Sequence, residues 1–278
     1  MGTKSEYGAR EVEAAKSVLV ELMQILGEYR EQMVLIGGWV PYFLFGNAHV
    51  GSTDVDLALD REEISDDVYE TIRGHLEKHG YEAGNQKFRF VKSIKIDEGQ
   101  PIAVAVDFLA GEYGGTGRSH RHQDVQDLKV RKARGCELAL EYHTRISVEG
   151  TTPGGAVNAV HLNLSDVVPF IVMKGMALFD RMKEKDAWDI YFCLREFPGG
   201  YAELAEQIKP VLDNGLVQEG LSKIRTKFLS TEHLGPIAIA DFDEISDRVE
   251  RERVKRDAFE RVSALLDNLR IDAYEDRA

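Results

Sequence analysis

A short strand, a glycine pair and a second strand with an Asp-x-Asp pair follow one another between residues 33 and 59. This order constrains the fold more than any other feature of the chain. The apolar, branched run from Met33 to Ile36 predicts a buried strand. Gly37 and Gly38 end it, and Pro41 stands where the first turn of a helix tolerates proline. Because a glycine pair lets backbone N–H groups approach a phosphate, the pattern fits a phosphate-binding turn, but it also fits an ordinary strand-to-helix turn.

Asp54 and Asp56 form the second half of this pattern. Residues two apart in a strand share a face, so both carboxylates point one way while Val55 and Leu57 point into the core. Two like charges this close repel each other unless a cation lies between them. Hard oxygen ligands suit Mg²⁺, which usually takes one or two protein carboxylates together with substrate phosphates. Taken alone, the pair fits a solvent-facing strand equally well.

A third carboxylate interrupts the apolar run from Ile102 to Leu109. Burying Asp107 there is costly unless the side chain is paired or bound to a metal. Gly111 follows soon after, so an aspartate that merely faces water at the end of its strand is the alternative. Together with the Asp-x-Asp pair, Asp107 predicts a metal site of three carboxylates that holds two Mg²⁺ ions.

The order of these residues resembles the DNA polymerase β-like nucleotidyltransferases. The resemblance implies an α+β fold, with a nucleotidyltransferase-like mixed β-sheet flanked by helices and a helical C-terminal part. It also implies that the three aspartates are catalytic metal ligands. Ser52 stands where that superfamily often has Ser or Thr. The residues implied to bind the nucleotide in this part of the chain are Gly37, Gly38 and Ser52.

A second motif lies between Phe170 and Leu194. Apolar residues recur there with helical spacing in two blocks, which predicts two helices joined near residues 182–185. Lys174 lies in the first helix, and Asp186 and Asp189 neighbour each other on one face of the second. The order Lys … Arg-x-Lys-x-Lys-Asp-x-x-Asp resembles the C-terminal motif of the AbiEii-like (AbiEii/AbiGii toxin) branch. A helix pair with a solvated charge patch is the alternative.

The AbiEii-like branch supplies toxins of bacterial toxin–antitoxin and phage-defence systems. The resemblance implies that Lys174 is catalytic and contacts the triphosphate, and that Asp186 and Asp189 orient it or complete the nucleotide pocket. Family members usually have Arg-Asp where this chain has Lys185-Asp186. The implied reaction is Mg-dependent transfer of an NMP from an NTP to an acceptor hydroxyl. RNA, including the tRNA 3′ end, is the favoured acceptor, and a cognate antitoxin is the implied protein partner.

Two other functions remain open on the sequence. Gly-Gly-Trp at residues 37–39 also occurs in aminoglycoside- and lincosamide-type nucleotidyltransferases, which favours a small-molecule acceptor. The second open function is that of a non-catalytic interaction module with a decayed site, although the three intact carboxylates argue against it. A basic stretch suits an RNA backbone or a polyphosphate, and equally a helix face balanced by acidic neighbours. Its members are Arg118, Arg121, Lys129, Arg131, Lys132 and Arg134.

Composition and charge narrow the class of protein. The net charge of −13 is unlike that of a general nucleic-acid binder, which is more often basic. Cys136 and Cys193 have no paired spacing, which predicts a reducing cytoplasm and no disulfide framework. No apolar run approaches the roughly 18 residues of a membrane span, and no signal peptide is recognisable. The pattern predicts a catalytic domain over residues 1–164 and a helical domain over residues 165–278 that contributes to the active site.

Overall fold

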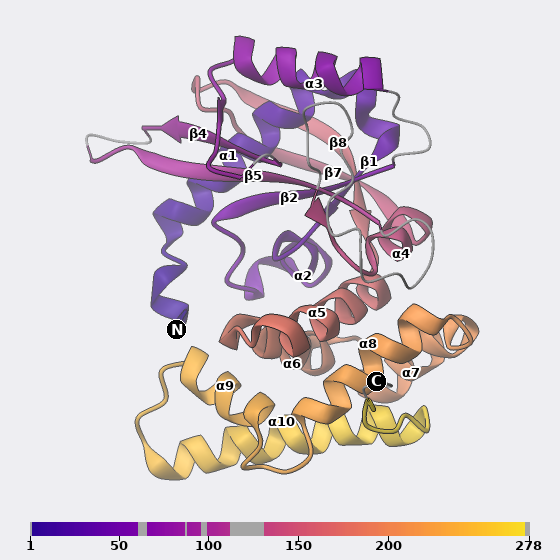
Figure 1. Cartoon of the computed structure of the whole chain (residues 1–278). Coiled ribbons are helices and arrows are strands. Elements are labelled where there is room, and N and C mark those ends of the chain that lie inside the picture. The colour runs from indigo at the N-terminus through magenta and orange to yellow at the C-terminus, as the bar shows by residue number, and fades with distance from the viewer. Residues whose placement is uncertain (1, 61–65, 87, 96–98, 112–130, 276–278) are drawn as a thin grey trace. The chain divides into compact units, whose positions relative to one another are not determined.

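The structure is a computed structural model that describes most of the chain (Figure 1). The described residues are 2–60, 66–86, 88–95, 99–111 and 131–275. Contacts among Cα atoms divide the chain into two compact units. The sheet unit comprises Tyr7–Val40 and Gly51–Asp166, and the helical unit comprises Met1–Glu6, Pro41–Val50 and Val167–Ala278.

This division lies close to the predicted boundary between residues 164 and 165 but differs from it in one respect. Two short segments from the first fifty residues, Met1–Glu6 and Pro41–Val50, belong with the helices. The chain therefore leaves the sheet unit just after the glycine pair and returns to it just before Asp54. The helix α2 (Trp39–Leu44) makes the first of these passages.

The sheet unit is built on one mixed sheet, as the sequence predicted. Its eight strands within the described residues are β1 (Met33–Ile36), β2 (Asp54–Leu59), β3 (Glu82–Ala83), β4 (Arg89–Ile94), β5 (Ile102–Ala110), β6 (Arg131–Lys132), β7 (His143–Thr151) and β8 (Val157–Ser165). They are ordered β3-β4-β5-β2-β1-β8-β7 across the sheet, and β6 pairs with β5. The central strand β2 is antiparallel to β1 and parallel to β5. The α+β fold class is thereby confirmed.

Helices pack on this sheet through their apolar faces. The amphipathic α1 (Ala9–Ile25) lies across the strands and contacts β2, β5, β7 and β8 (Figure 1). The short α4 (Cys136–Glu141) packs on β1, β2 and β5, and α3 (Asp66–Lys78) precedes β3. The central strand β1 is buried at all four positions, as its apolar run predicted. The core thus fixes the strands that carry the three aspartates.

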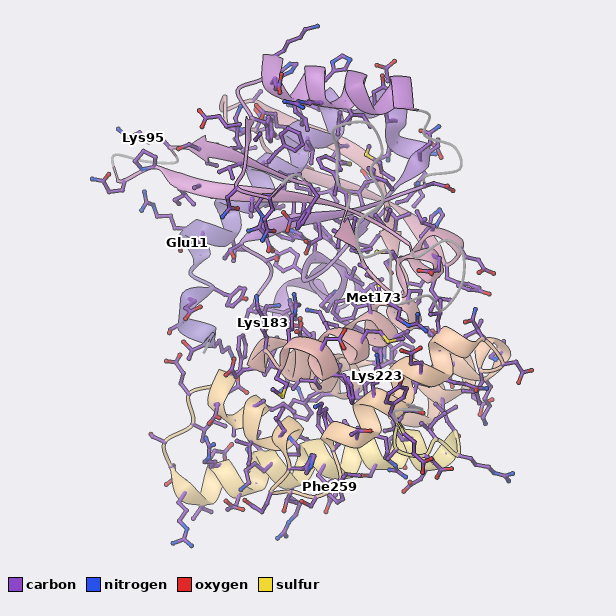
Figure 2. The ribbon with its side chains drawn as sticks, in the orientation of Figure 1. Glu11, Lys95, Met173, Lys183, Lys223 and Phe259 are labelled. Carbon is purple, nitrogen blue, oxygen red and sulfur yellow. The ribbon has the colours of Figure 1, made fainter. Side chains whose placement is uncertain are left out.

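The helical unit contains α5 (Val167–Arg181), α6 (Glu184–Glu196), α7 (Gly200–Ile208), α8 (Gly215–Lys227), α9 (Leu234–Phe242) and α10 (Arg248–Asn268). The helix α5 packs on α6 and α8, and α10 contacts α6, α7, α8 and α9. Met173 on α5 and Lys183, directly before α6, are labelled in Figure 2. None of the helices in the described part of the chain combines the length and hydropathy of a membrane span.

Two glycines allow α5 and α8 to approach closely. A Cβ added at Gly175 would lie 2.4 Å from the carbonyl oxygen of Gly220, and one added at Gly220 would lie 2.9 Å from that of Val172. Backbone atoms cannot move aside as the end of a flexible side chain can. Small residues are therefore required on both sides of this crossing, which supports the helix that carries Lys174.

We expect Gly175→Ala to lower the free energy of unfolding by about 2 kcal/mol, because overpacking outweighs the gain in helix propensity. Gly74→Ala in α3 is the matched control, since a Cβ there meets no atom of the described residues within 4 Å. The control should leave stability unchanged or raise it by up to about 1 kcal/mol. Urea unfolding of both variants checks this, and equal stabilities would contradict the close approach of α5 and α8.

Candidate active site

Asp54, Asp56 and Asp107 lie on the adjacent parallel strands β2 and β5. The register places Asp56 beside Asp107 and Asp54 beside Ala105. Because register partners on parallel strands project to the same face, the three carboxylates share one face of the sheet. Asp107 is 4% exposed, whereas Asp54 and Asp56 are partly exposed. The sequence predicted this grouping of residues, and the strand register brings it about.

Arg89 compensates part of this negative charge, although no motif in the sequence predicted a role for it. It lies on β4 opposite Asp107. Its Nε and Nη2 donate hydrogen bonds to Oδ1 and Oδ2 of Asp107 at 2.7 and 2.6 Å. These bonds raise the pKa of Arg89 above its ordinary value, and the negative charges of Asp107, Asp54 and Asp56 add to the effect. A two-point contact of this kind also fixes the orientation of the carboxylate.

Gly37 brings the backbone up against Asp56. The register pairs Ile36 with Asp56, so the glycine turn begins directly beside this aspartate. Gly37 has a φ of 72°, in the left-handed region that favours glycine. A Cβ at this position would lie 2.3 Å from Oδ2 of Asp56. Glycine is therefore required here for its backbone conformation and for the space it leaves.

Ser52 holds the side chain of Asp54, and Trp39 holds its backbone. The Ser52 hydroxyl donates to Oδ1 of Asp54 at 2.6 Å, and Trp39 Nε1 donates to the Asp54 carbonyl oxygen at 2.8 Å. Both residues are buried. Trp39 is thus part of the scaffold beneath Asp54. Ser52 orients the carboxylate.

The donor set fits a hard divalent cation. Asp54, Asp56 and Asp107 offer only oxygen atoms, which Mg²⁺ prefers. Both oxygens of Asp107 are bonded to Arg89, and no group of three or more Asp, Glu, His or Cys side chains converges as a metal site among the described residues. Asp54 and Asp56, whose side chains are partly exposed, are the residues that would hold the ion.

A second group of charged residues lies in the helical unit. Nζ of Lys174 lies 2.8 Å from Oδ1 of Asp186 and 2.7 Å from Oδ2 of Asp189. The two aspartates share a face of α6, as their spacing predicted, and are 1% and 0% exposed. This burial contradicts the alternative of a solvated charge patch. Charged groups taken out of water must be paired, which explains why the three residues form one network.

Two further cations complete this network, and the sequence analysis assigned them no role. Arg181 donates two hydrogen bonds to Asp186, at 2.8 and 2.9 Å. Lys185 donates to both oxygens of Asp189, at 2.9 and 3.2 Å. Three cationic side chains therefore face two carboxylates, which leaves one positive charge in excess. An excess of positive charge suits a polyphosphate ligand.

Burial and charge pairing act in opposite directions on these groups. Burial alone would lower the pKa of Lys174, but the attraction of Asp186 and Asp189 outweighs it and raises that pKa. Burial alone would raise the pKa of both aspartates, but Lys174 and its neighbouring cations lower them, that of Asp189 well below its usual value. Burial prevails at Lys185, whose pKa is lowered. Lys174 and both carboxylates therefore stay charged at neutral pH.

His49 also bonds to this network. Its Nε2 lies 2.9 Å from Oδ1 of Asp189, and its ring packs against Trp188 and Phe192 at centroid distances of 5.1 and 4.8 Å. Burial and the positive charge of Lys185 lower the pKa of His49 from 6.5 to about 4. The imidazole is therefore neutral near pH 7, and its Nε2–H donates to Asp189. The sequence around His49 contains no motif, so it did not predict the hydrogen bond with Asp189.

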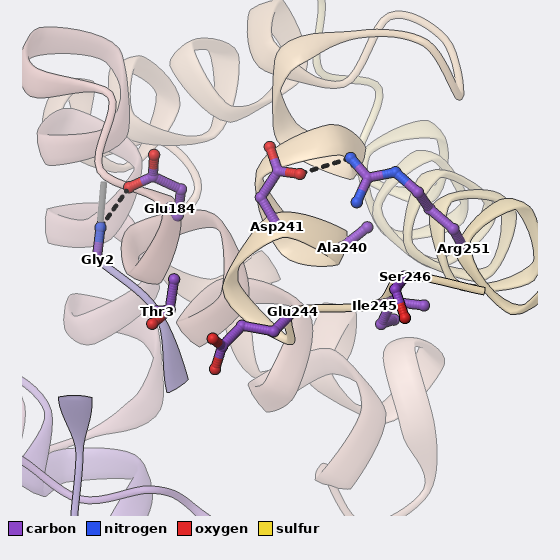
Figure 3. A pocket seen from close by; sticks show the side chains of 9 residues that line it. All are labelled: Gly2, Thr3, Glu184, Ala240, Asp241, Glu244, Ile245, Ser246 and Arg251. Atoms are coloured by element: carbon purple, nitrogen blue, oxygen red, sulfur yellow. Dashed lines mark hydrogen bonds and ion pairs between the residues drawn. The ribbon is translucent and has the colours of Figure 1, made fainter. Parts of the chain in front are cut away.

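A cavity of about 380 Å³ lies in the helical unit, apart from both groups of charged residues (Figure 3). None of the predicted site residues lines it. Its charged lining residues are Glu184, Asp241, Glu244 and Arg251, and Arg251 donates to Asp241 at 2.5 Å. Three acids against one arginine do not suit a triphosphate.

We expect Gly37→Ala to weaken binding of Mn²⁺, used as a probe for Mg²⁺, about tenfold, because the new methyl group displaces the carboxylate of Asp56. Gly46→Ala is the matched control: Gly46 has a similar φ of 68°, but within the described part of the chain no atom would lie within 4 Å of its added Cβ. Both variants should lose about 1 kcal/mol of stability from backbone strain. Electron paramagnetic resonance of bound Mn²⁺ and urea unfolding provide the two readouts. Equal Mn²⁺ affinities would contradict the contact between Gly37 and Asp56.

The lowered pKa of His49 predicts a loss of stability in mild acid. As the pH falls, the unfolded chain takes up a proton on His49 near 6.5, whereas the folded chain does so only near 4. When the pH falls from about 7 to about 5, the free energy of unfolding of the natural chain should therefore decrease. This decrease should exceed that of His49→Gln, which lacks the imidazole, by about 2 kcal/mol. Asp186 and Asp189 have lowered pKa values, so their contribution is lost only at lower pH and in both proteins. Urea unfolding at the two pH values checks this, and equal losses would contradict a buried neutral imidazole.

Comparison with known proteins identifies the family. A model of the nucleotidyl transferase AbiEii toxins of type IV toxin–antitoxin systems matches residues 21–268. A solved nucleotidyltransferase-like antigenic protein from Paracoccidioides brasiliensis is 18% identical, with 85% of this chain and 98% of that chain covered and a TM-score of 0.46. MenT4, a nucleotidyltransferase toxin from Mycobacterium tuberculosis, is 15% identical, with 99% and 94% covered and a TM-score of 0.42. No curated protein sequence gives a significant match.

The family match spans both units of the structure and every predicted site residue. It agrees with the resemblance inferred from the aspartates of the sheet unit and from the Lys174 motif. The chain therefore belongs to the AbiEii nucleotidyl transferase toxin family and is a nucleotidyltransferase.

Proposed function

We propose that this nucleotidyltransferase moves an NMP from an NTP to an acceptor hydroxyl in a Mg²⁺-dependent reaction that releases pyrophosphate. One observation carries the proposal: Asp54, Asp56 and Asp107 share a face of two adjacent strands, directly beside the turn at Gly37. Three carboxylates in this arrangement repel one another unless cations compensate them, and Arg89 supplies one positive charge.

Residues of the glycine turn and of β2 bind the nucleotide in this proposal. Asp54 and Asp56 would hold the metal ion, and Asp107 would take part in holding a second ion by sharing its oxygens with Arg89. When bound, Mg²⁺ neutralises the triphosphate and polarises the reacting phosphoryl group. Gly37 and Gly38 present backbone N–H groups to the phosphates. Ser52 keeps the carboxylate of Asp54 in one orientation through their 2.6 Å hydrogen bond.

Asp107 acts on the acceptor. Its carboxylate accepts the hydrogen bond of the acceptor hydroxyl and then its proton. A bond forms between the acceptor oxygen and the α-phosphorus, the bond from the α-phosphorus to the bridging oxygen breaks, and pyrophosphate leaves with that oxygen. Arg89 holds Asp107 at two points, so the carboxylate is fixed before the acceptor arrives.

Lys174 neutralises the charge that builds on the β- and γ-phosphates as pyrophosphate departs. Its ammonium group keeps its charge because Asp186 and Asp189 raise its pKa. Asp186 and Asp189 also fix its position, at 2.8 and 2.7 Å. The single excess positive charge of the network supports binding of an anionic ligand.

We favour RNA, with the tRNA 3′ end in view, as the acceptor, and a cognate antitoxin as a protein partner. The description of the family as toxins of type IV toxin–antitoxin systems supports the antitoxin. Of the basic stretch, Arg118, Arg121 and Lys129 lie outside the described residues. The Gly-Gly-Trp pattern favoured a small-molecule acceptor. Trp39 supports that acceptor less in the structure, because its side chain is buried and bonded to the backbone of Asp54.

We expect Asp56→Asn to reduce NMP transfer on the order of 10³-fold while the fold is retained, because the amide removes a metal ligand but keeps the shape of the side chain. Asp213→Asn, at an exposed position before α8, is the matched control and should retain full activity. Incubation with each α-³²P-labelled NTP, Mg²⁺ and total RNA provides the measurement. Undiminished labelling by Asp56→Asn would contradict the assignment of the carboxylates.

The same assay separates the acceptors. Labelled RNA would support RNA as the acceptor. If incubation with an aminoglycoside or a lincosamide instead yields a labelled small molecule, the acceptor is that small molecule and not RNA. Absence of transfer to RNA, protein and small molecules with all four NTPs would favour the non-catalytic interaction module.

A further inference from the structure

His49 lies outside both sequence motifs, yet its side chain bonds to a motif carboxylate that is fully buried. The side chains of His49 and Asp189 are both 0% exposed. The histidine belongs to the segment Pro41–Val50, which joins the helical unit although the residues before and after it belong to the sheet unit.

Asp189 accepts hydrogen bonds or ion pairs from three side chains. Lys174 approaches Oδ2 at 2.7 Å, His49 approaches Oδ1 at 2.9 Å, and Lys185 lies near both oxygens. A buried carboxylate depends on its protein partners, because water does not replace a lost donor there. Loss of His49 would leave Oδ1 with Lys185, so the carboxylate could rotate toward Lys185 and its hold on Lys174 would weaken.

The ring of His49 is fixed from the other side. Trp188 and Phe192 contact it, and Trp188 Nε1 is itself held by Asp243 at 3.0 Å. Phe45, from the same segment as His49, packs against Phe192 with 6.1 Å between ring centroids. The segment Pro41–Val50 is thus attached to the helices through the aromatic contacts of Phe45 and His49 and through the hydrogen bond of His49. A ring held on several sides can direct its N–H at one acceptor.

We propose that His49 is a positioning residue for nucleotide binding: its Nε2–H fixes the carboxylate of Asp189, which in turn holds the ammonium group of Lys174. This inference rests on the proposed contact of Lys174 with the triphosphate. The lowered pKa of the buried imidazole keeps His49 a neutral donor over the range in which Asp189 is charged. Lys174 retains its second anchor, Asp186, so loss of His49 misplaces the ammonium group without removing it.

A histidine that only fills space would be replaceable by an apolar side chain of similar size. His49→Leu keeps most of the volume and removes the donor. His49→Gln keeps an N–H donor near the position of Nε2, whereas His49→Asn has the same amide one methylene too short. The Gln and Asn variants are both polar, so their comparison remains informative if the Leu variant does not fold.

The test measures KM for the NTP, kcat and the urea unfolding midpoint for the full chain. We expect His49→Leu and His49→Asn to raise KM for the NTP about tenfold, and His49→Gln to stay within about threefold of the natural chain. His161→Leu, at an exposed position on β8, should leave KM unchanged. Equal KM values for Gln, Asn and natural chain would overturn the proposal. So would KM changes in Gln and Asn that are equal and follow only the loss of stability.

Lys174→Met separates this inference from the function on which it rests. If Lys174→Met raises KM for the NTP and His49→Asn does not, the role of His49 is wrong and the assignment of Lys174 stands. If Lys174→Met leaves KM unchanged, the contact of Lys174 with the triphosphate is wrong, and the role proposed for His49 is overturned with it. If both raise KM while His49→Gln does not, both assignments are supported.

Discussion

The parallel pairing of β2 with β5 is the constraint on which the candidate site depends. It places Asp56 beside Asp107, with Asp54 two residues along the same strand. Negative charges this close destabilise a fold unless cations compensate them. Arg89 on β4 supplies one positive charge, and Gly37 at the end of β1 leaves room for the carboxylate of Asp56. The strands on both sides of the β2–β5 pair are thus adapted to it.

The helical unit meets the same physical requirement in another way. Asp186 and Asp189 are almost completely buried on α6, and cations from α5 and α6 surround them. Here the compensation exceeds the negative charge by one. The sheet unit therefore groups carboxylates, and the helical unit groups cations around two buried carboxylates.

Much of the fold could be predicted because its central elements carry strong local patterns. The strands β1, β2 and β5 are apolar runs interrupted only by the functional aspartates, and α5 and α6 have clear helical spacing. The edge strand β7 was not predicted, because Val148 is its one buried residue and periodicity is weak at such positions. The attachment of residues 41–50 to the helices was not predicted either, since no local pattern records which unit a connecting segment joins.

The sequence by itself determined the family, the fold class and the residue types of the candidate site. These follow from order and spacing along the chain, which a Gly-Gly turn, an Asp-x-Asp pair and a Lys … Asp-x-x-Asp motif express directly. Only the tertiary structure decided which side chains accompany them. Arg89 reaches Asp107 through the pairing of β4 with β5, and His49 reaches Asp189 across 140 residues of sequence. Such partners depend on strand register and burial, and an arginine or a histidine carries no local sign of the carboxylate that it will meet.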